Sequence, residues 1–287
     1  DPNEAHGGDP FACTLYKMLP KPMQESSRED IHLLEYLHQV PVDKVGIPEY
    51  HPVLSGKLKD KKSLNLIYPV EGGLYVHVMD DPDGGRAYYI AVEPTLSSGN
   101  DDQKLMGEIE TWLLDFSEEF DGADEPEQQR EVLERLLERL ADDHQSDESG
   151  LRGFVRGLIK RSTANHLKIS SANLKVIKYL MVRDKLGLGM LEPMIRDVNI
   201  EDISCSGLGS MFLEHKIFKS LKTNIEFGSM EELDTFVIQL SEKIGKPVTY
   251  RNPIVDAVLP DGSSINLVFG ADVSRRGSNF TIRKFSA

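Results

Sequence analysis

The stretch LPDGSSINLVFGADVSRRGSNFTIRKF, residues 259–285, predicts that the chain ends in consecutive β-hairpins. Asp261-Gly262 is a strong two-residue hairpin signal, because both central positions of a type I′ turn require positive φ. Apolar and polar residues then alternate from Ser264 onward, as expected for a strand with one buried face. The apolar residues of this strand are Ile265, Leu267 and Phe269.

A second turn follows at Arg275-Arg276-Gly277 and introduces basic residues. The strand after it closes with Arg283 and Lys284. Its predicted apolar face consists of Phe280, Ile282 and Phe285. An arginine on a strand beside a glycine turn can direct a planar, permanently charged guanidinium at phosphate oxygens. The alternative is that Arg283 is an ordinary surface residue of the strand.

The chain as a whole is typical of a globular protein with room for two domains. It has 287 residues with 39% hydrophobic content, no apolar run long enough for a transmembrane helix, and a polar N-terminal segment unlike a signal peptide. Its two cysteines, Cys13 and Cys205, are far apart, which argues against a disulfide framework and a cysteine zinc site. These features predict a cytoplasmic location.

The formal net charge of −14 is unevenly distributed. Residues 1–100 hold 15 acidic and 9 basic residues (−6), residues 101–150 hold 18 and 4 (−14), and residues 151–287 hold 14 and 20 (+6). A polar segment, DDHQSDESG, ends the acidic stretch at residue 150. We therefore predict a boundary between an accessory module, residues 1–150, and a second domain, residues 151–287.

The accessory module is predicted to be α+β. Residues 1–62 are rich in proline and loop-like, with one amphipathic helix near 28–39. Residues 64–94 are expected to form a small antiparallel meander of three strands. The turns between these strands are marked by Gly72-Gly73 and by the DPDGG segment.

Two acidic helices are predicted after the meander, over 105–120 and 127–143, from apolar residues at three- and four-residue steps. Their carboxylates suggest a calcium site, but the D-x-D-x-D-G spacing of a calcium loop is missing. We therefore expect a solvated acidic face. The single tryptophan, Trp112, lies in the apolar stripe of the first helix, which predicts a role in core packing.

Residues 151–287 are also predicted to be α+β. Two helices are expected over 151–186, followed by short strands at DISCSG, MFLEHKIF and SLKTNIEF. Ser229 and Glu232 are spaced as a capping box at the start of a further helix, which Gly245 ends. Together with the closing hairpins, these elements predict a helical segment and a small mixed or antiparallel sheet.

The sequence contains no catalytic constellation that can be assembled from known motifs. Gly56-Lys57 and Gly245-Lys246 lack the upstream glycine and the hydroxyl of a P-loop, and the eight histidines have no ligand spacing. H-E-x-x-H, G-x-S-x-G and G-x-G-x-x-G do not occur. The chain alone is therefore predicted to be inactive and to contain no metal site.

Residues 179–285 resemble the secretion-superfamily traffic ATPases, most closely their archaeal branch. That branch includes the GspE-like motors of type II secretion and type IV pilus assembly and the archaellum motor. The matching stretches occur in the family's order and spacing over about 107 residues, and residues 1–150 show no such resemblance. They are YLMVRDKLGLGMLEPMIRDVNIEDISCSG, LEHKIFKSLKTNIEF, EELDTFVIQLSEKIGKPV, NPIVDAVLPDGSSI and RRGSNFTIRKF.

The resemblance implies that residues 151–287 form the N-terminal domain that precedes a RecA-like motor domain, which carries the Walker motifs and uses ATP and Mg²⁺. In the family the motor domain follows the segment matching FTIRKF, where this sequence ends. We therefore expect the hairpin to border an inter-domain cleft, and we expect no bound nucleotide on the fragment alone.

The same resemblance implies which residues contact nucleotide, because arginines of the family's N-terminal domain approach the ATP phosphates. By position these are Arg283 and Arg276, with Arg275, Lys284, Asp261 and Gly262 in supporting positions. The sequence departs from the family at Ser264, where arginine is usual. One phosphate contact is therefore lost, or is replaced by one of the arginines of the second turn.

For the full-length protein, the resemblance implies a hexameric ring at the cytoplasmic face of the membrane. The expected partners are its own motor domain, neighbouring subunits and a polytopic inner-membrane platform protein, and ATP hydrolysis would power secretion or the assembly of a pilus or archaellum. No nucleic acid is expected, because the basic residues are not interleaved with stacking aromatics. The alternative is a scaffold protein that has lost the motor domain, which the serine at position 264 favours.

Overall fold

The computed structural model describes residues 10–96, 102–145, 169 and 171–285, and it confirms the predicted α+β class. The chain divides into two compact units, one formed by Asp1–Glu93 with Met190–Ala287 and the other by Pro94–Gly189. Within the described ranges, every helix is too short or too polar to traverse a lipid bilayer.

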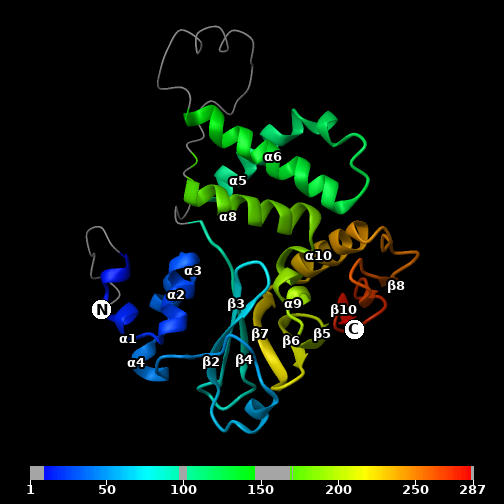
Figure 1. Ribbon diagram of the computed structural model, residues 1–287. Coiled ribbons are helices and arrows are strands. Elements are labelled where there is room, and N and C mark those ends of the chain that lie inside the picture. Colours follow the sequence, from blue (N-terminus) through cyan, green and yellow to red (C-terminus); the bar gives the residue numbers. More distant parts are fainter. Residues whose placement is uncertain (1–9, 97–101, 146–168, 170, 286–287) are drawn as a thin grey trace. The chain divides into compact units, whose positions relative to one another are not determined.

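A ten-stranded mixed sheet is the framework of the first unit (Figure 1). The strand order is β1-β2-β3-β4-β7-β6-β5-β10-β9-β8, and the pairs β1/β2 and β4/β7 are parallel. The strands are β1 (Glu49–Tyr50), β2 (Asn65–Val70), β3 (Leu74–Met79), β4 (Tyr88–Val92), β5 (Ile200–Cys205), β6 (Gly209–His215), β7 (Lys219–Phe227), β8 (Ile254–Val258), β9 (Ser264–Val268) and β10 (Asn279–Arg283).

The junction between β4 and β7 joins the N-terminal meander to the C-terminal strands. Tyr88 and Tyr89 of β4 pair in parallel with Lys222 and Thr223 of β7. The predicted boundary near residue 150 assigned these strands to different domains, whereas the structure places them in one sheet. A separate meander would expose two strand edges, and this pairing covers one of them. Residue 150 itself lies outside the described residues.

Four short helices precede the sheet, so the prediction of a loop-like segment with one helix near 28–39 is wrong for most of this region. Pro20 and Pro41 stand directly before the first turns of two helices, where a missing N–H costs no helical hydrogen bond. The prolines that suggested loops therefore mark helix starts. The helices are α1 (Thr14–Met18), α2 (Lys21–Glu29), α3 (Ile31–Gln39) and α4 (Val42–Val45).

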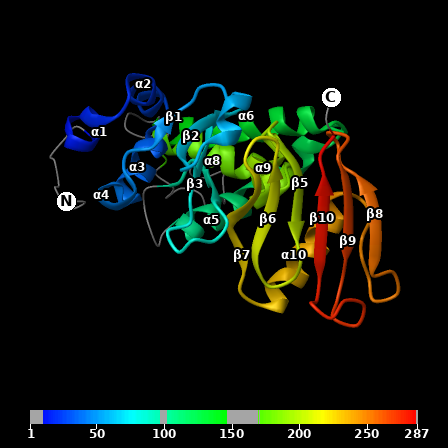
Figure 2. The ribbon, with the colours of Figure 1, turned by 90° about the horizontal axis from the view of Figure 1, so that it is seen from below.

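Helix α10 (Met230–Lys243) packs against β7, β9 and β10 on one face of the C-terminal strands (Figure 2). Its predicted start is confirmed, because Ser229 Oγ accepts a hydrogen bond from Glu232 N at 3.2 Å. Glu232 Oε2 accepts from Gly228 N at 2.9 Å, one residue before the position that a capping box uses. Phe236 of the helix lies 5.6 Å from the ring of Phe280 on β10, which fixes this as the buried face.

The second unit is helical and consists of α5 (Asp102–Leu114), α6 (Pro126–Gln145) and α8 (Ser171–Met181). Trp112 is 5% exposed in its core, as predicted. Helix α8 packs on α6, and Lys178 pairs with Glu138 at 2.6 Å, so the predicted boundary at 150 separates two helices that share a core. The first of the two helices predicted over 151–186 falls outside the described residues.

Candidate functional site

The turn between β8 and β9 differs from the predicted type I′ turn. Gly262 has φ +85°, whereas Asp261 is not among the described non-glycine residues with positive φ. The loop spans five residues and is closed by bonds from Gly262 N to Leu259 O at 2.9 Å and from Leu259 N to Ser263 O at 2.8 Å. Asp261 accepts from Ser263 N at 3.0 Å and Ser263 Oγ at 2.7 Å. These two bonds from Ser263 to its carboxylate order the turn.

Seven adjacent strands align a continuous row of side chains on the sheet face opposite α10. Because side chains alternate along a strand, cross-strand partners in this row face the same side. In sheet order the row is Tyr88, Lys222, Phe212, Ser204, Thr281, Asn266 and Asp256. A second row, two residues further along each strand, is Ser220, Glu214, Asp202, Arg283, Ser264 and Val258.

Arg283 lies in the middle of the second row, at the end of β10. Its Nε donates to Asp202 Oδ1 at 3.1 Å, and its side chain remains 80% exposed. Its partner on the other side is Ser264 of β9. This ion pair uses one of the five N–H donors of the guanidinium, and the exposure leaves the others accessible to an anion.

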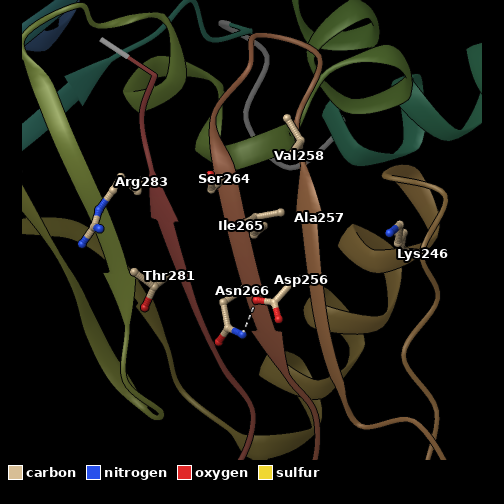
Figure 3. A pocket seen from close by; sticks show the side chains of 9 residues that line it. All are labelled: Lys246, Asp256, Ala257, Val258, Ser264, Ile265, Asn266, Thr281 and Arg283. Carbon is tan, nitrogen blue, oxygen red and sulfur yellow. Dashed lines mark hydrogen bonds between the residues drawn. The ribbon is translucent and has the colours of Figure 1, made fainter.

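A shallow groove of about 760 Å³ follows this part of the open face (Figure 3). Arg283 and Lys246 lie on opposite sides of it, and Lys246 comes from the loop after α10. Between them Asn266 Nδ2 donates to Asp256 Oδ1 at 2.9 Å. The groove is lined by Lys246, Asp256, Ala257, Val258, Ser264, Ile265, Asn266, Thr281 and Arg283. The Arg283 guanidinium, with the hydroxyls of Thr281 and Ser264 near it, suits an anionic oxygen ligand.

The predicted site residues Arg275 and Arg276 lie at the other end of β10. Both are exposed in the loop before the strand. Gly277 has φ +80°, and a Cβ there would lie 2.5 Å from Met230 Sδ of α10, so this turn requires glycine. Arg276 precedes β10 and Arg283 ends it, which separates them by on the order of 20 Å. The structure therefore does not bring the two predicted phosphate contacts together.

Lys284, predicted as a supporting residue, points away from Arg283 and is bound by backbone. Its Nζ donates to three carbonyl oxygens at the end of α9 (Glu192–Arg196): Met194 at 3.2 Å, Ile195 at 2.5 Å and Asp197 at 2.6 Å. Burial lowers the pKa of Lys284, and the carboxylates of Asp197 and Asp261 oppose that effect. All three donors of the ammonium thus bind carbonyls, two of them in the last turn of the short helix and the third at its C-cap residue, Asp197.

Asp197 is the centre of a buried hydrogen-bond network beside α9. The residue is 1% exposed, and its Oδ2 accepts from the hydroxyls of Tyr68 at 2.5 Å and Tyr89 at 3.2 Å. Its Oδ1 accepts from the backbone N and the Nδ2 of Asn199 at 2.8 and 2.9 Å. Burial, with the nearby carboxylate of Asp197, raises the pKa of both tyrosines, so both remain donors.

His215 extends this network in a defined tautomer. Its Nδ1 accepts hydrogen bonds from the backbone N of Ile217 at 3.0 Å and Phe218 at 3.3 Å, which places the proton on Nε2. Nε2 lies 3.2 Å from the hydroxyl of Tyr68. Burial lowers the pKa of His215 to about 4, although the charge of Asp197 acts in the opposite direction. The imidazole is therefore neutral at physiological pH.

The sequence singled out Arg283 and Ser264 as candidate positions, but not the other groups around the guanidinium. Thr281 and Asn266 were detectable, because the predicted alternation places them opposite the apolar positions of their strands. Asp202 was not detectable, because it lies next to Arg283 only through the pairing of β5 with β10, which joins distant parts of the sequence. Within the described ranges, no cluster of three or more acidic, histidine or cysteine side chains has the arrangement of a metal site.

No protein-family model matches the chain. It is 35% identical over 264 residues to the uncharacterized protein MJ0900 of Methanocaldococcus jannaschii, covering 92% of this chain and 47% of that protein. It is also 35% identical over 147 residues to the uncharacterized protein MJ1288 of the same organism, covering 50% of this chain and 58% of that protein. The chain thus spans about half the length of the curated relatives it matches.

Among solved structures, the VirB11 ATPase from the Brucella suis type IV secretion system, in complex with sulphate, is similar to part of the chain. The likeness has a TM-score of 0.29 at 21% sequence identity and covers 34% of this chain and 30% of that one. Values this low establish neither a common fold nor a common activity.

Proposed function

We propose that this chain is the N-terminal coupling region of a traffic ATPase of the secretion superfamily. The observation that carries the proposal is the position of Arg283. This exposed guanidinium lies on an open sheet face, at the end of the stretch that resembles the family, with one carboxylate partner and free donors. The relative MJ0900 is longer than this chain, because the matched region covers only 47% of it, and this leaves room for a motor domain.

The residues around Arg283 fit a phosphate group. Arg283 binds the anion through its remaining N–H donors, and Asp202 orients the guanidinium from the side of β5. Thr281 and Ser264 place hydroxyls on the same face, where they can donate to oxygen. Bound ATP with Mg²⁺ would supply the phosphoryl group whose transfer drives the motor.

Because the groove is open to solvent, strong binding of an anion there requires a second protein surface that covers it. A pair between an exposed arginine and an anion is worth little in water, because solvent screens it. A motor domain that covers the face would exclude water and strengthen the contact at Arg283. We therefore expect nucleotide at this site in the full-length ring, with the membrane platform and neighbouring subunits as partners, and no bound nucleotide on the chain alone.

The first test is ATP turnover by the full-length protein. Arg283→Gln removes the positive charge and keeps most of the side-chain volume, and we expect kcat/KM to fall about tenfold to a hundredfold, the effect of one charge-assisted hydrogen bond. Arg251→Gln is the matched control, because Arg251 is exposed in the bend before β8 and does not line the groove. Its kcat/KM should stay within twofold of wild type.

Two results would contradict the proposal. Equal effects of Arg283→Gln and Arg251→Gln would show that Arg283 is an ordinary surface residue. Absence of ATP hydrolysis by the full-length protein would favour the scaffold alternative. Arg276→Gln tests the other predicted contact, which lies at the far end of β10. A loss of turnover there would require a second site of contact with nucleotide at the far end of β10.

A further inference from the structure

The C-terminal end of β10 is held from three directions, immediately next to Arg283. Lys284 N donates to Glu201 O of β5 at 2.8 Å, and Phe285 N donates to Ser263 Oγ of the β8–β9 turn at 3.1 Å. The Lys284 ammonium binds the end of α9 through three carbonyls. The backbone that carries Arg283 is thus fixed by contacts with β5, the β8–β9 turn and α9, while the guanidinium faces the open side of the sheet.

The end of α9 is itself fixed by the N-terminal meander. Asp197, whose carbonyl accepts from Lys284 Nζ, receives hydrogen bonds on its carboxylate from Tyr68 of β2 and Tyr89 of β4. These two strands belong to the segment without family resemblance. A chain of hydrogen bonds, buried at Asp197 and partly buried at Lys284, therefore leads from the meander to the residue next to Arg283.

We propose that Lys284 and Asp197 are positioning residues for Arg283, and that the N-terminal meander controls the orientation of this arginine through Tyr68 and Tyr89. The functional part of this inference rests on the proposed function, whereas its structural part does not. A partner that binds the meander and shifts β2 or β4 would change the phosphate contact without touching the groove. This assigns a regulatory role to a segment that carries no catalytic motif.

The physical basis is the sensitivity of an arginine contact to its geometry. A guanidinium binds phosphate through directional N–H bonds, and a displacement of about 1 Å at a reacting group can cost on the order of a hundredfold in rate. Phenylalanine in place of Tyr68 and Tyr89 keeps the packing of the rings and removes the two donors to Asp197, together with the Tyr68 oxygen that lies 3.2 Å from His215 Nε2. Methionine in place of Lys284 keeps the length of the side chain and removes all three bonds to α9.

The structural half is tested by hydrogen exchange on the full-length protein. In Tyr68→Phe/Tyr89→Phe and in Lys284→Met, we expect the amides of Lys284 and Phe285 to exchange at least tenfold faster, because their anchor on α9 is weakened. Tyr75→Phe is the matched control: Tyr75 lies on β3 and donates to Asp30 Oδ2 at 3.0 Å, a buried bond that does not lead to α9. Unchanged exchange in the variants, or an equal increase in the control, would overturn the inference.

The functional half is tested by a double-mutant cycle for ATP turnover. Tyr68→Phe/Tyr89→Phe should lower kcat/KM at least fivefold when Arg283 is present and have no further effect in the Arg283→Gln background. A merely structural role would produce the same loss in both backgrounds, and that result would overturn the positioning role. Faster exchange together with an Arg283→Gln variant of normal turnover would instead refute the proposed function and leave the structural coupling intact.

Discussion

Replacing Asp197 with alanine is expected to lower the free energy of unfolding by about 3–5 kcal/mol. The carboxylate is 1% exposed and accepts four hydrogen bonds, two of them from the buried hydroxyls of Tyr68 and Tyr89. Its removal leaves these donors without an acceptor in a dry interior, and each unsatisfied group costs about 1–3 kcal/mol. The bonds from Asn199 that shape the turn after α9 are lost at the same time.

Urea unfolding of Asp197→Ala and of a second aspartate variant measures this effect. Asp256→Ala is the matched control, because Asp256 is exposed on the open face and accepts a single bond from Asn266. We expect its free energy of unfolding to change by about 0.5 kcal/mol or less. If the two variants were equally stable, the buried carboxylate would not organise this part of the fold, and the coupling between the meander and α9 would lose its basis.

The local features of this fold were predictable because their causes lie within a few residues of sequence. Ser229 and Gly245 mark the two ends of α10 through a side-chain cap and a left-handed glycine, and both were recognised. The β8–β9 hairpin was also recognised from Asp261-Gly262. Its turn type was not, because the loop spans five residues and Gly262, but not Asp261, adopts positive φ.

The non-local features were not predictable from this one sequence. The pairing of β4 with β7 brings Tyr89 and Thr223 together, although the whole of the helical unit lies between these strands in the sequence. No local sequence pattern indicates which distant strand β4 pairs with. Arg283 was identified through its family resemblance, but its carboxylate partner Asp202 depends on long-range strand pairing. Lys284 was assigned to the phosphate side, whereas strand alternation places it on the opposite face, next to α9.

Acidification is expected to destabilise the protein through two buried histidines, His77 and His215. Both are 0% exposed, and burial lowers the pKa of each from 6.5 to about 4. His77 receives a hydrogen bond on Nδ1 from the Tyr36 hydroxyl at 2.7 Å, and its Nε2 lies 2.8 Å from Asn65 Oδ1. In both rings Nδ1 is an acceptor, so a second proton would break existing bonds.

The direction in which stability changes with pH follows from proton linkage. Between about pH 6.5 and pH 4 the unfolded state binds more protons at these histidines than the folded state does, so stability is complete above this window and is lost as the pH falls through it. Each histidine contributes about 1.4 kcal/mol per pH unit, and about 3 kcal/mol over the whole window. The two together therefore have the largest effect expected for this protein.

Urea unfolding between about pH 7 and pH 5, where most exposed carboxylates stay ionised, isolates this contribution. His215→Gln and His77→Gln should each reduce the pH slope by roughly half, and the double variant should remove most of it. NMR titration of the ring protons in the wild type gives an independent check that does not depend on how well the variants fold. A wild-type ring that titrates near its ordinary pKa of about 6.5 would contradict the prediction. For His215 it would mean that the charge of Asp197 offsets the effect of burial on the imidazole.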